Sequence, residues 1–172
     1  QRLQSHDRIM EAVRYAGEIR RVDAALDRLL RVVPPGTIVL LVSDHGEALG
    51  EHGERTHGAL CFSATSDIFL AVRAPGLAPG ATDRQPRSIC DIAPSLRSWC
   101  DLPAVPSDGA PLFEPSGRPV VTESFYYWRL HGWGQCFSVS NGRRSLVESG
   151  PALELFDLDR DPAEVSPKEP RG

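Results

Sequence analysis

The chain has 172 residues, of which 41% are hydrophobic and 24% are charged, and this length and composition suit one ordinary globular domain with a sizeable core. Its formal net charge of −4 at pH 7 argues against a surface built mainly to bind nucleic acid. The longest apolar runs, such as residues 38–42, have five residues, whereas a membrane-spanning helix needs about 20, so the visible sequence predicts no membrane span.

The first third of the chain carries a helical pattern. Apolar residues recur at steps of three and four from Ile9 to Val33, and arginines and aspartates fill many of the positions between them. This pattern predicts a helix over residues 7–32 with one face against a core. Proline and glycine at residues 34–36 end the helix, because proline lacks the amide hydrogen that a helix needs.

A continuous β-branched and aliphatic run follows at residues 37–42. It is too short for a helix, and its uniform apolar character is typical of a strand covered on both faces in a parallel sheet. A helix that leads into such a strand is half of a β-α-β unit, in which sites lie at the carboxyl ends of strands. Residues 43–47 occupy that position.

The later elements are predicted to be shorter. In chain order they are a strand at 67–72, a helix at 89–99, a Pro- and Gly-rich connection at 103–119, short strands at 119–122, 136–140 and 145–147 with a hairpin at 141–142, and a frayed tail from residue 157. The four cysteines form no C-x-x-C pair, so we interpret them as buried apolar residues rather than a metal cage.

The predicted fold class is α/β. Residues 1–103 form a parallel or mixed sheet with flanking helices, in which the strand at 38–42 lies near the centre. Residues 104–172 form a smaller antiparallel, β-rich section and tail of the same fold.

Chemistry-bearing side chains concentrate at residues 43–58, which read S-D-H-G-E-A-L-G-E-H-G-E-R-T-H-G and hold three of the five histidines. Carboxylate oxygen and imidazole nitrogen together suit zinc or manganese, and calcium or magnesium where further carboxylates complete the shell. Asp44 and His45 reach one ion only if the strand ends there and Gly46 turns the backbone, since neighbours on a strand face opposite sides. The alternative is a polar loop with solvated side chains.

Four segments carry motifs that occur together in one known family. They are the helical segment 15–30, the stretch 37–76 with S-D-H-G-E, the segment ICDIAPSLRSWCDLP at 89–103, and ELFDLDRDPAE at 154–164. In this order and at these separations they resemble the sulfatase family of the alkaline phosphatase superfamily. The resemblance covers most of the chain and implies an alkaline-phosphatase-like sheet with flanking helices and a small antiparallel C-terminal section.

The resemblance implies roles for the matching residues. It implies that Asp44 and His45 bind a divalent cation, with calcium first and manganese, magnesium or zinc as the alternatives. It implies that His57 is catalytic and binds the substrate, either by contacting an ester oxygen or by protonating the leaving group.

Three further residues have weaker assignments. His131 lies in an aromatic segment of the kind that borders the substrate pocket in similar sulfatases, although a histidine among aromatic residues is often structural. Glu47 is interpreted as an orienting or capping carboxylate, and His52 as a loop histidine that faces solvent.

The sequence departs from the family at the nucleophile. Sulfatases of this type make formylglycine from a C-x-P-x-R or S-x-P-x-R motif and hold the metal with an additional Asp-Asp pair, and the chain contains none of these. We therefore expect a C-terminal portion of a longer enzyme that lacks its N-terminal part and is inactive alone; the start at Gln1 agrees with this. Any export signal would precede Gln1, so the location of the protein, periplasmic and extracellular included, stays open.

Three functions stay open from the sequence. The first is metal-dependent hydrolysis of small-molecule or glycan sulfate esters. The second is a phosphodiesterase, phosphonate hydrolase or phosphoethanolamine transferase of the same superfamily, which only the nucleophile would distinguish. The third is a non-catalytic binding or structural module. As a portion of a larger sheet, the chain would leave open edges and apolar surface, so we expect poor solubility or association.

Overall fold

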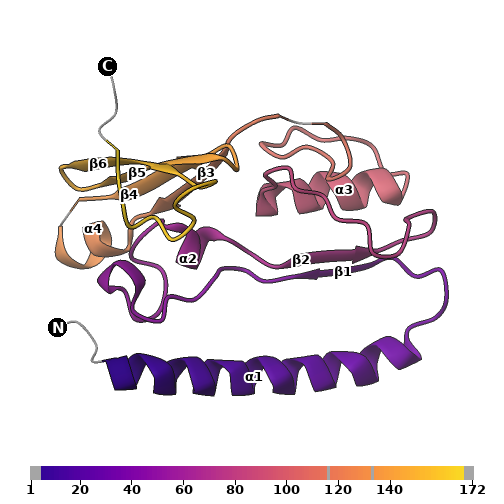
Figure 1. Ribbon diagram of the computed structural model, residues 1–172. Coiled ribbons are helices and arrows are strands. Elements are labelled where there is room, and N and C mark those ends of the chain that lie inside the picture. The colour runs from indigo at the N-terminus through magenta and orange to yellow at the C-terminus, as the bar shows by residue number, and fades with distance from the viewer. Residues whose placement is uncertain (1–4, 116, 133, 169–172) are drawn as a thin grey trace. The chain divides into compact units, whose positions relative to one another are not determined.

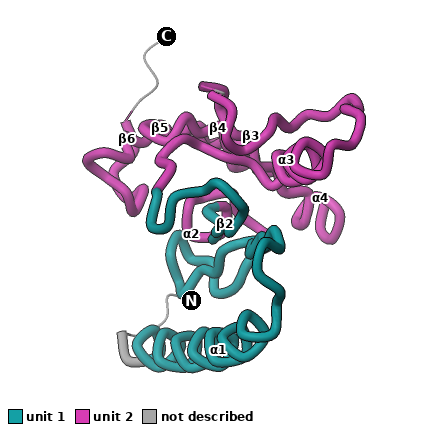
Figure 2. Tube along the Cα trace, turned by 90° about the vertical axis from the view of Figure 1, so that its right-hand side faces the viewer, with its two compact units in different colours: residues 1–57, 67–81 teal, residues 58–66, 82–172 magenta. Residues whose placement is uncertain are grey.

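A computed structural model describes residues 5–115, 117–132 and 134–168 (Figure 1). Its contacts divide the chain into two compact units: unit 1, residues 1–57 and 67–81, and unit 2, residues 58–66 and 82–172 (Figure 2). The elements in order are α1 (Ser5–Val32), β1 (Val39–Val42), η1 (Glu51–Gly53), α2 (Ser63–Ser66), β2 (Leu70–Arg73), η2 (Ile89–Asp91), α3 (Ile92–Trp99), β3 (Val120–Ser124), α4 (Tyr126–His131), β4 (Cys136–Ser140), β5 (Arg144–Ser149) and β6 (Ala152–Asp157). The predicted boundary between residues 103 and 104 separates two sections of one fold and stays a prediction.

The long N-terminal helix is confirmed, since α1 runs over Ser5–Val32. The prediction that its apolar face packs on a core is wrong for the described residues: Ile9 is 62% exposed and Val13 is 61% exposed. Helical spacing establishes that an apolar face exists but does not say what covers it. Among the described residues, no helix is both long and apolar enough to cross a membrane.

Strand β1 pairs with β2 in antiparallel register, with Val39 opposite Arg73 and Val42 opposite Leu70. The expectation of a central parallel strand, within a parallel or mixed sheet, is therefore wrong in the part of the chain that the structure describes, where the neighbour of β1 is antiparallel. All four residues of β1 are half-buried rather than covered on both faces. An apolar run indicates that both faces of a strand carry apolar side chains, but it does not indicate whether the neighbouring strand is parallel or antiparallel.

The end of β1 lies where the sequence places it. The Ser43 amide donates to the Phe69 carbonyl at 3.0 Å, and the Phe69 amide donates to Ser43 Oγ at 2.9 Å. This reciprocal pair closes the two-stranded ribbon, so the residues that follow Ser43 leave the ladder. Asp44 and His45 are thereby released from strand geometry.

Unit 2 contains an antiparallel sheet in the order β3-β4-β5-β6 (Figure 1). The predicted hairpin between β4 and β5 is confirmed: Asn141 Oδ1 accepts the amides of Arg143 and Arg144 at 3.0 and 2.9 Å. Gly142 has a φ of 80°, a left-handed conformation that glycine adopts without strain. Strand β6 is an element that the sequence analysis missed.

One face of this sheet carries the core of unit 2. The Phe62 and Phe156 rings meet edge to face with centroids 6.0 Å apart. The interpretation of the cysteines as buried is confirmed for two of them and wrong for Cys90 and Cys100, which are exposed. The buried cluster consists of Cys61, Phe62, Cys136, Val147 and Phe156.

The predicted frayed tail is wrong for residues 157–168. Asp161 accepts the amides of Val165 and Ser166 at 3.1 and 2.8 Å, which closes a compact turn. Glu164 is 2% exposed, and its carboxylate accepts the Ser63 amide at 2.7 Å. Side-chain acceptors order this segment, and a composition rich in proline and acidic residues does not reveal them. Residues 169–172 of the tail lie outside the described residues.

A buried carboxylate fastens the Pro- and Gly-rich connection to the helix that precedes it. Asp91 is 1% exposed and ends η2, just before α3. It accepts the amides of Ser88 and Ala110 at 2.8 and 2.9 Å and pairs with the Arg118 guanidinium. The predicted surface connection therefore follows a defined path.

We predict that Asp91→Ala lowers the free energy of unfolding by about 3 kcal/mol or more, because it leaves the Arg118 charge and two amides without their acceptor. Urea unfolding followed by tryptophan fluorescence measures the loss. Asp108→Ala, at an exposed position of the same connection, is the control. A loss below about 1 kcal/mol for Asp91→Ala contradicts the prediction.

The exposed apolar side chains of α1 predict that the chain associates when it is alone. Replacing Val13 and Ile19 together by serine should lower the average mass in light scattering, because it removes apolar surface that another molecule would cover. Ala12→Ser with Ala24→Ser makes the same chemical change on smaller side chains and should leave association as it is. A wild-type chain that stays monomeric at high concentration would refute this expectation.

Candidate functional site

The candidate site lies in the loop that follows β1, in unit 1. The Ala48 amide donates to the Thr56 carbonyl at 2.8 Å, and Ala48 is 1% exposed. This bond folds the loop back on itself, so Glu47 and His57 become neighbours although ten residues separate them. The backbone of the loop turns at Gly50, His52 and Gly53, which have positive φ angles. Gly46, where the sequence predicts a turn, does not have a positive φ.

Asp44 and His45 approach each other at the start of the loop, as the sequence requires of two ligands of one ion. Asp44 Oδ1 accepts the His45 amide at 3.1 Å and lies 3.7 Å from His45 Nε2. The Asp44 side chain is 85% exposed and that of His45 is 39% exposed. His45 Nδ1 lies 2.7 Å from the Gly46 carbonyl oxygen.

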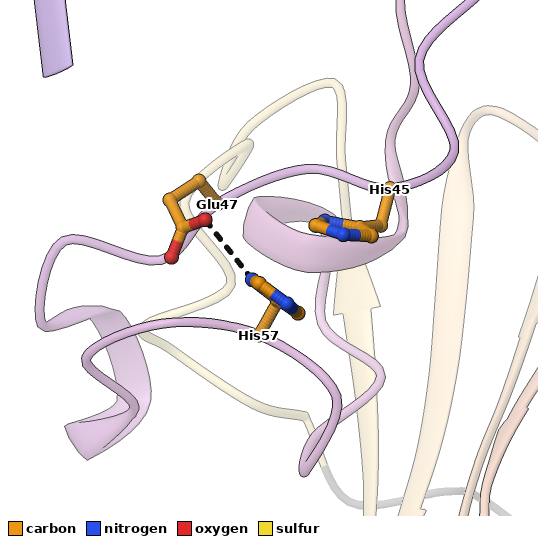
Figure 3. Close-up of side chains that lie close together, drawn as sticks. All are labelled: His45, Glu47 and His57. Carbon is orange, nitrogen blue, oxygen red and sulfur yellow. Dashed lines mark hydrogen bonds and ion pairs between the residues drawn. The ribbon is translucent and has the colours of Figure 1, made fainter.

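His57 joins this pair from the returning half of the loop. Its ring stacks on that of His45, with centroids 3.8 Å apart and planes at 28° (Figure 3). Its Nδ1 lies 3.0 Å from Glu47 Oε2. One donor atom from each of His45, Glu47 and His57 lies within 4.8 Å of the others. The interpretation of Glu47 as an orienting carboxylate agrees with its contact to His57.

Helix α1 holds the loop through two arginine contacts. Arg8 donates to the Leu49 carbonyl at 3.2 Å and to Glu51 at 3.1 Å. Arg55 donates to Glu11 on α1 at 2.7 Å. The sequence analysis missed these arginine contacts, because the sequence indicates them only through opposite charges at distant positions.

Glu51, in the middle of this loop, has a displaced pKa. Partial burial by itself would raise the pKa of Glu51, but the backbone amides bonded to its carboxylate and the nearby Arg8 guanidinium outweigh burial and lower the pKa below its ordinary value. The Leu49 amide is one of these donors. The carboxylate of Glu51 is thus stabilised as an anion that organises the middle of the loop.

The other two histidines of the sequence analysis are not members of this donor group. His52 is exposed, as expected of a loop histidine. His131 belongs to unit 2, at the end of α4, where its ring centroid lies 6.0 Å from that of Tyr127. Its role at a substrate pocket stays a prediction.

Known proteins resemble the chain in sequence and in fold. It is 29% identical to the choline-sulfatase of Rhizobium meliloti (strain 1021) over 169 residues, which span 88% of this chain and 31% of the choline-sulfatase. Its structure matches a 2-O GAG sulfatase with a TM-score of 0.66 at 21% identity, over 86% of this chain and 35% of that one. It also matches the phosphonate monoester hydrolase of Agrobacterium radiobacter with a TM-score of 0.60 at 25% identity, over 76% and 30%. No protein-family model matches the chain.

The chain has the fold of the sulfatase and alkaline phosphatase superfamily. It corresponds to the C-terminal part of these sulfatase-like proteins and spans about a third of their length, 31% of the choline-sulfatase and 35% of the 2-O GAG sulfatase. The resemblance and the mixed α/β fold with a small antiparallel C-terminal section are thus confirmed.

The donors on the loop after β1 are of the kinds that bind a divalent cation. Asp44 and Glu47 offer carboxylate oxygens, and His45 and His57 offer imidazole nitrogens, all on one loop. Carboxylates and imidazoles are the side chains that bind divalent cations in most protein sites that lack cysteine.

We predict that protonation of Glu51 loosens the Leu49 amide. Because the pKa of Glu51 is lowered, its stabilising contacts are complete above the ordinary range of a glutamic acid and are lost as the pH falls through the lowered pKa. The Leu49 amide resonance in ¹⁵N-resolved spectra should follow this change. Glu51→Gln should abolish the acid titration of that resonance, and Glu54→Gln should not; persistence of the titration in Glu51→Gln contradicts the assignment.

Proposed function

We propose that this chain is the C-terminal part of a metal-dependent, sulfatase-type hydrolase that cleaves sulfate esters of small molecules or glycans. The observation that carries the proposal is the meeting of Asp44, His45 and His57 on one loop of a chain with the superfamily's fold. The substrate class follows the names of the choline-sulfatase and the 2-O GAG sulfatase.

In this proposal Asp44 and His45 bind the divalent cation, with calcium, manganese, magnesium and zinc as the candidates. When bound, such an ion stabilises the charge that develops on the ester oxygens. His57 contacts an ester oxygen or protonates the leaving group. Glu47 accepts the Nδ1 proton of His57 and so turns Nε2 of that ring away from the carboxylate.

The nucleophile in this proposal belongs to polypeptide outside this chain. The sequence has no C-x-P-x-R or S-x-P-x-R motif, and the chain spans 31% of the choline-sulfatase. The partner of the chain is then the remaining, N-terminal part of the enzyme, and the exposed apolar side chains of α1 offer it a surface. The chain alone is inactive.

A second candidate, hydrolysis of a phosphonate monoester, has a specific observation in its favour. The fold match to the phosphonate monoester hydrolase of Agrobacterium radiobacter has a TM-score of 0.60 at 25% identity. A divalent cation and a histidine beside it serve displacement at phosphorus as well as at sulfur. The two candidates differ in the nucleophile and in the ester that is turned over faster.

We predict no turnover of an aryl sulfate by the chain alone and turnover once it is joined to the polypeptide encoded before Gln1. In the joined protein, Asp44→Ala should lower kcat/KM about 100-fold or more, because it removes a ligand of the cation. His52→Asn, on the same loop and outside the donor group, is the control. If the chain alone turns over the aryl sulfate, and Asp44→Ala abolishes that turnover, the claim that the chain alone is inactive is wrong. If the joined protein turns over an aryl phosphonate faster than the aryl sulfate, the second candidate function is favoured.

A further inference from the structure

We propose that the outer face of the sheet in unit 2 is an interface through which two copies of this chain form a dimer (Figure 1). The outer face is the side of the sheet opposite the buried cluster that holds Val147 and Phe156. Its residues lie outside the donor group on the loop after β1. A dimer through this face is therefore independent of the proposed hydrolase chemistry.

Alternation along the strands gives the sheet one core face and one outer face. In β5, Ser145 and Val147 are 3% and 0% exposed, and Leu146 between them is half-buried and points to the opposite side. Burial alternates in the same sense in β4 and β6, with Cys136 and Phe156 on the core face. The side chains between these buried residues are therefore presented on the outer face.

A row of aliphatic side chains crosses the outer face from one edge strand to the other. Each lies directly opposite the next in the register, and together they are Val121, Val139, Leu146 and Leu155. Directly opposed residues on one face have Cβ atoms about 4.5–5.5 Å apart, so the row is continuous. Val121 is 60% exposed and Val139 is 39% exposed. A contiguous exposed apolar surface of this kind is typical of a protein–protein contact.

Charged side chains flank this row with opposite signs. Arg144 lies two residues before Leu146 on β5 and Glu148 lies two residues after it, so all three share the outer face. Glu123 of β3 lies on the same side of the row as Glu148, since both are opposite Phe137. One side of the row is thus acidic, and the other side carries an arginine.

The charges on β5 are available to a second molecule. Within the described ranges of the chain, neither Arg144 nor Glu148 forms an ion pair, and both are exposed. Asp157, which lies opposite Arg144 on β6, is already paired with Lys168 at 2.8 Å. A partner that brings an acidic group to Arg144 and a basic group to Glu148 would satisfy both.

A second copy of the chain is such a partner. When two outer faces meet through a half-turn about an axis that crosses β5 at Leu146, at a right angle to the strand, the two β5 strands run antiparallel. The Arg144 of each copy then lies opposite the Glu148 of the other, and the aliphatic rows meet in the middle. Packed sheets lie about 10 Å apart, a gap that an arginine and a glutamate side chain span together.

Charge selects this arrangement over the other face-to-face dimer. A half-turn about an axis along the strand would place Arg144 on Arg144 and Glu148 on Glu148, and like charges that face each other in an interface oppose association. A second copy satisfies the favourable arrangement by symmetry alone, whereas an unrelated partner would need a matching order of charges.

The test measures dimer formation by sedimentation equilibrium. It uses the 172-residue chain with Val13→Ser and Ile19→Ser, which reduce association through the exposed side chains of α1. We expect a monomer–dimer equilibrium with a dissociation constant in the micromolar range. Arg144→Glu and Glu148→Arg, each alone, should raise that constant about tenfold or more, because each places like charges together at both symmetry-related contacts. The variant with both changes restores opposite charges and should return the constant to within about threefold of its starting value.

Arg20→Glu is the matched control. It makes the same change of charge at an exposed arginine of α1 and should leave the dissociation constant unchanged. Val139→Ser tests the aliphatic row separately and should raise the constant about threefold or more, because it removes apolar surface that the dimer buries. Circular dichroism and urea unfolding check that each variant is folded, as substitutions at exposed positions should leave it.

Several results would overturn the proposal. They are a chain that stays monomeric, single charge reversals that change nothing, a combined variant as weak as the single ones, and an equal effect of Arg20→Glu. The protein joined to the polypeptide encoded before Gln1 should also dimerise and respond to the same variants. A monomeric joined protein assigns the outer face to the rest of the enzyme and overturns the proposal too. Turnover of the aryl sulfate is measured separately, so the hydrolase is decided independently.

Discussion

The candidate site depends on one backbone hydrogen bond, from the Ala48 amide to the Thr56 carbonyl at 2.8 Å. It joins the outgoing and the returning halves of the loop directly beside Glu47 and His57. With it, Glu47 meets His57 and the His57 ring reaches His45. The buried methyl of Ala48 leaves no room for a charged residue at that position, so packing and hydrogen bonding act together to bring the chemistry-bearing side chains into one group.

Different kinds of interaction hold the start and the middle of the loop. At its start, the reciprocal bonds between Ser43 and Phe69 end the strand pair. In its middle, Arg8 of α1 holds Leu49 and Glu51, and these contacts are half exposed and individually weak. Backbone pairing therefore sets where the site begins, and surface charges tune how tightly the loop is held.

Most of the local elements were predictable, because they depend on neighbouring residues. The periodicity of α1, the aliphatic run of β1 and the Asn141-Gly142 hairpin are each encoded within a few turns or a few residues. The direction of the partner of β1 was not predictable, since an apolar strand suits parallel and antiparallel neighbours alike. The ordered tail was missed because the carboxylate of Glu164 accepts a hydrogen bond from the Ser63 amide, which lies 101 residues away in the sequence.

The sequence by itself determined the residue types of the site, its place after an apolar strand and the resemblance to sulfatases, because these depend on order along the chain. Only the tertiary structure decided which of the polar residues at 43–58 meet. His57 stacks on His45, while the exposed His52 of the same loop is not part of the donor group. The physical reason is that a loop's closing bonds and positive φ angles, at Gly50, His52 and Gly53, set the direction of each side chain, and composition carries no record of them.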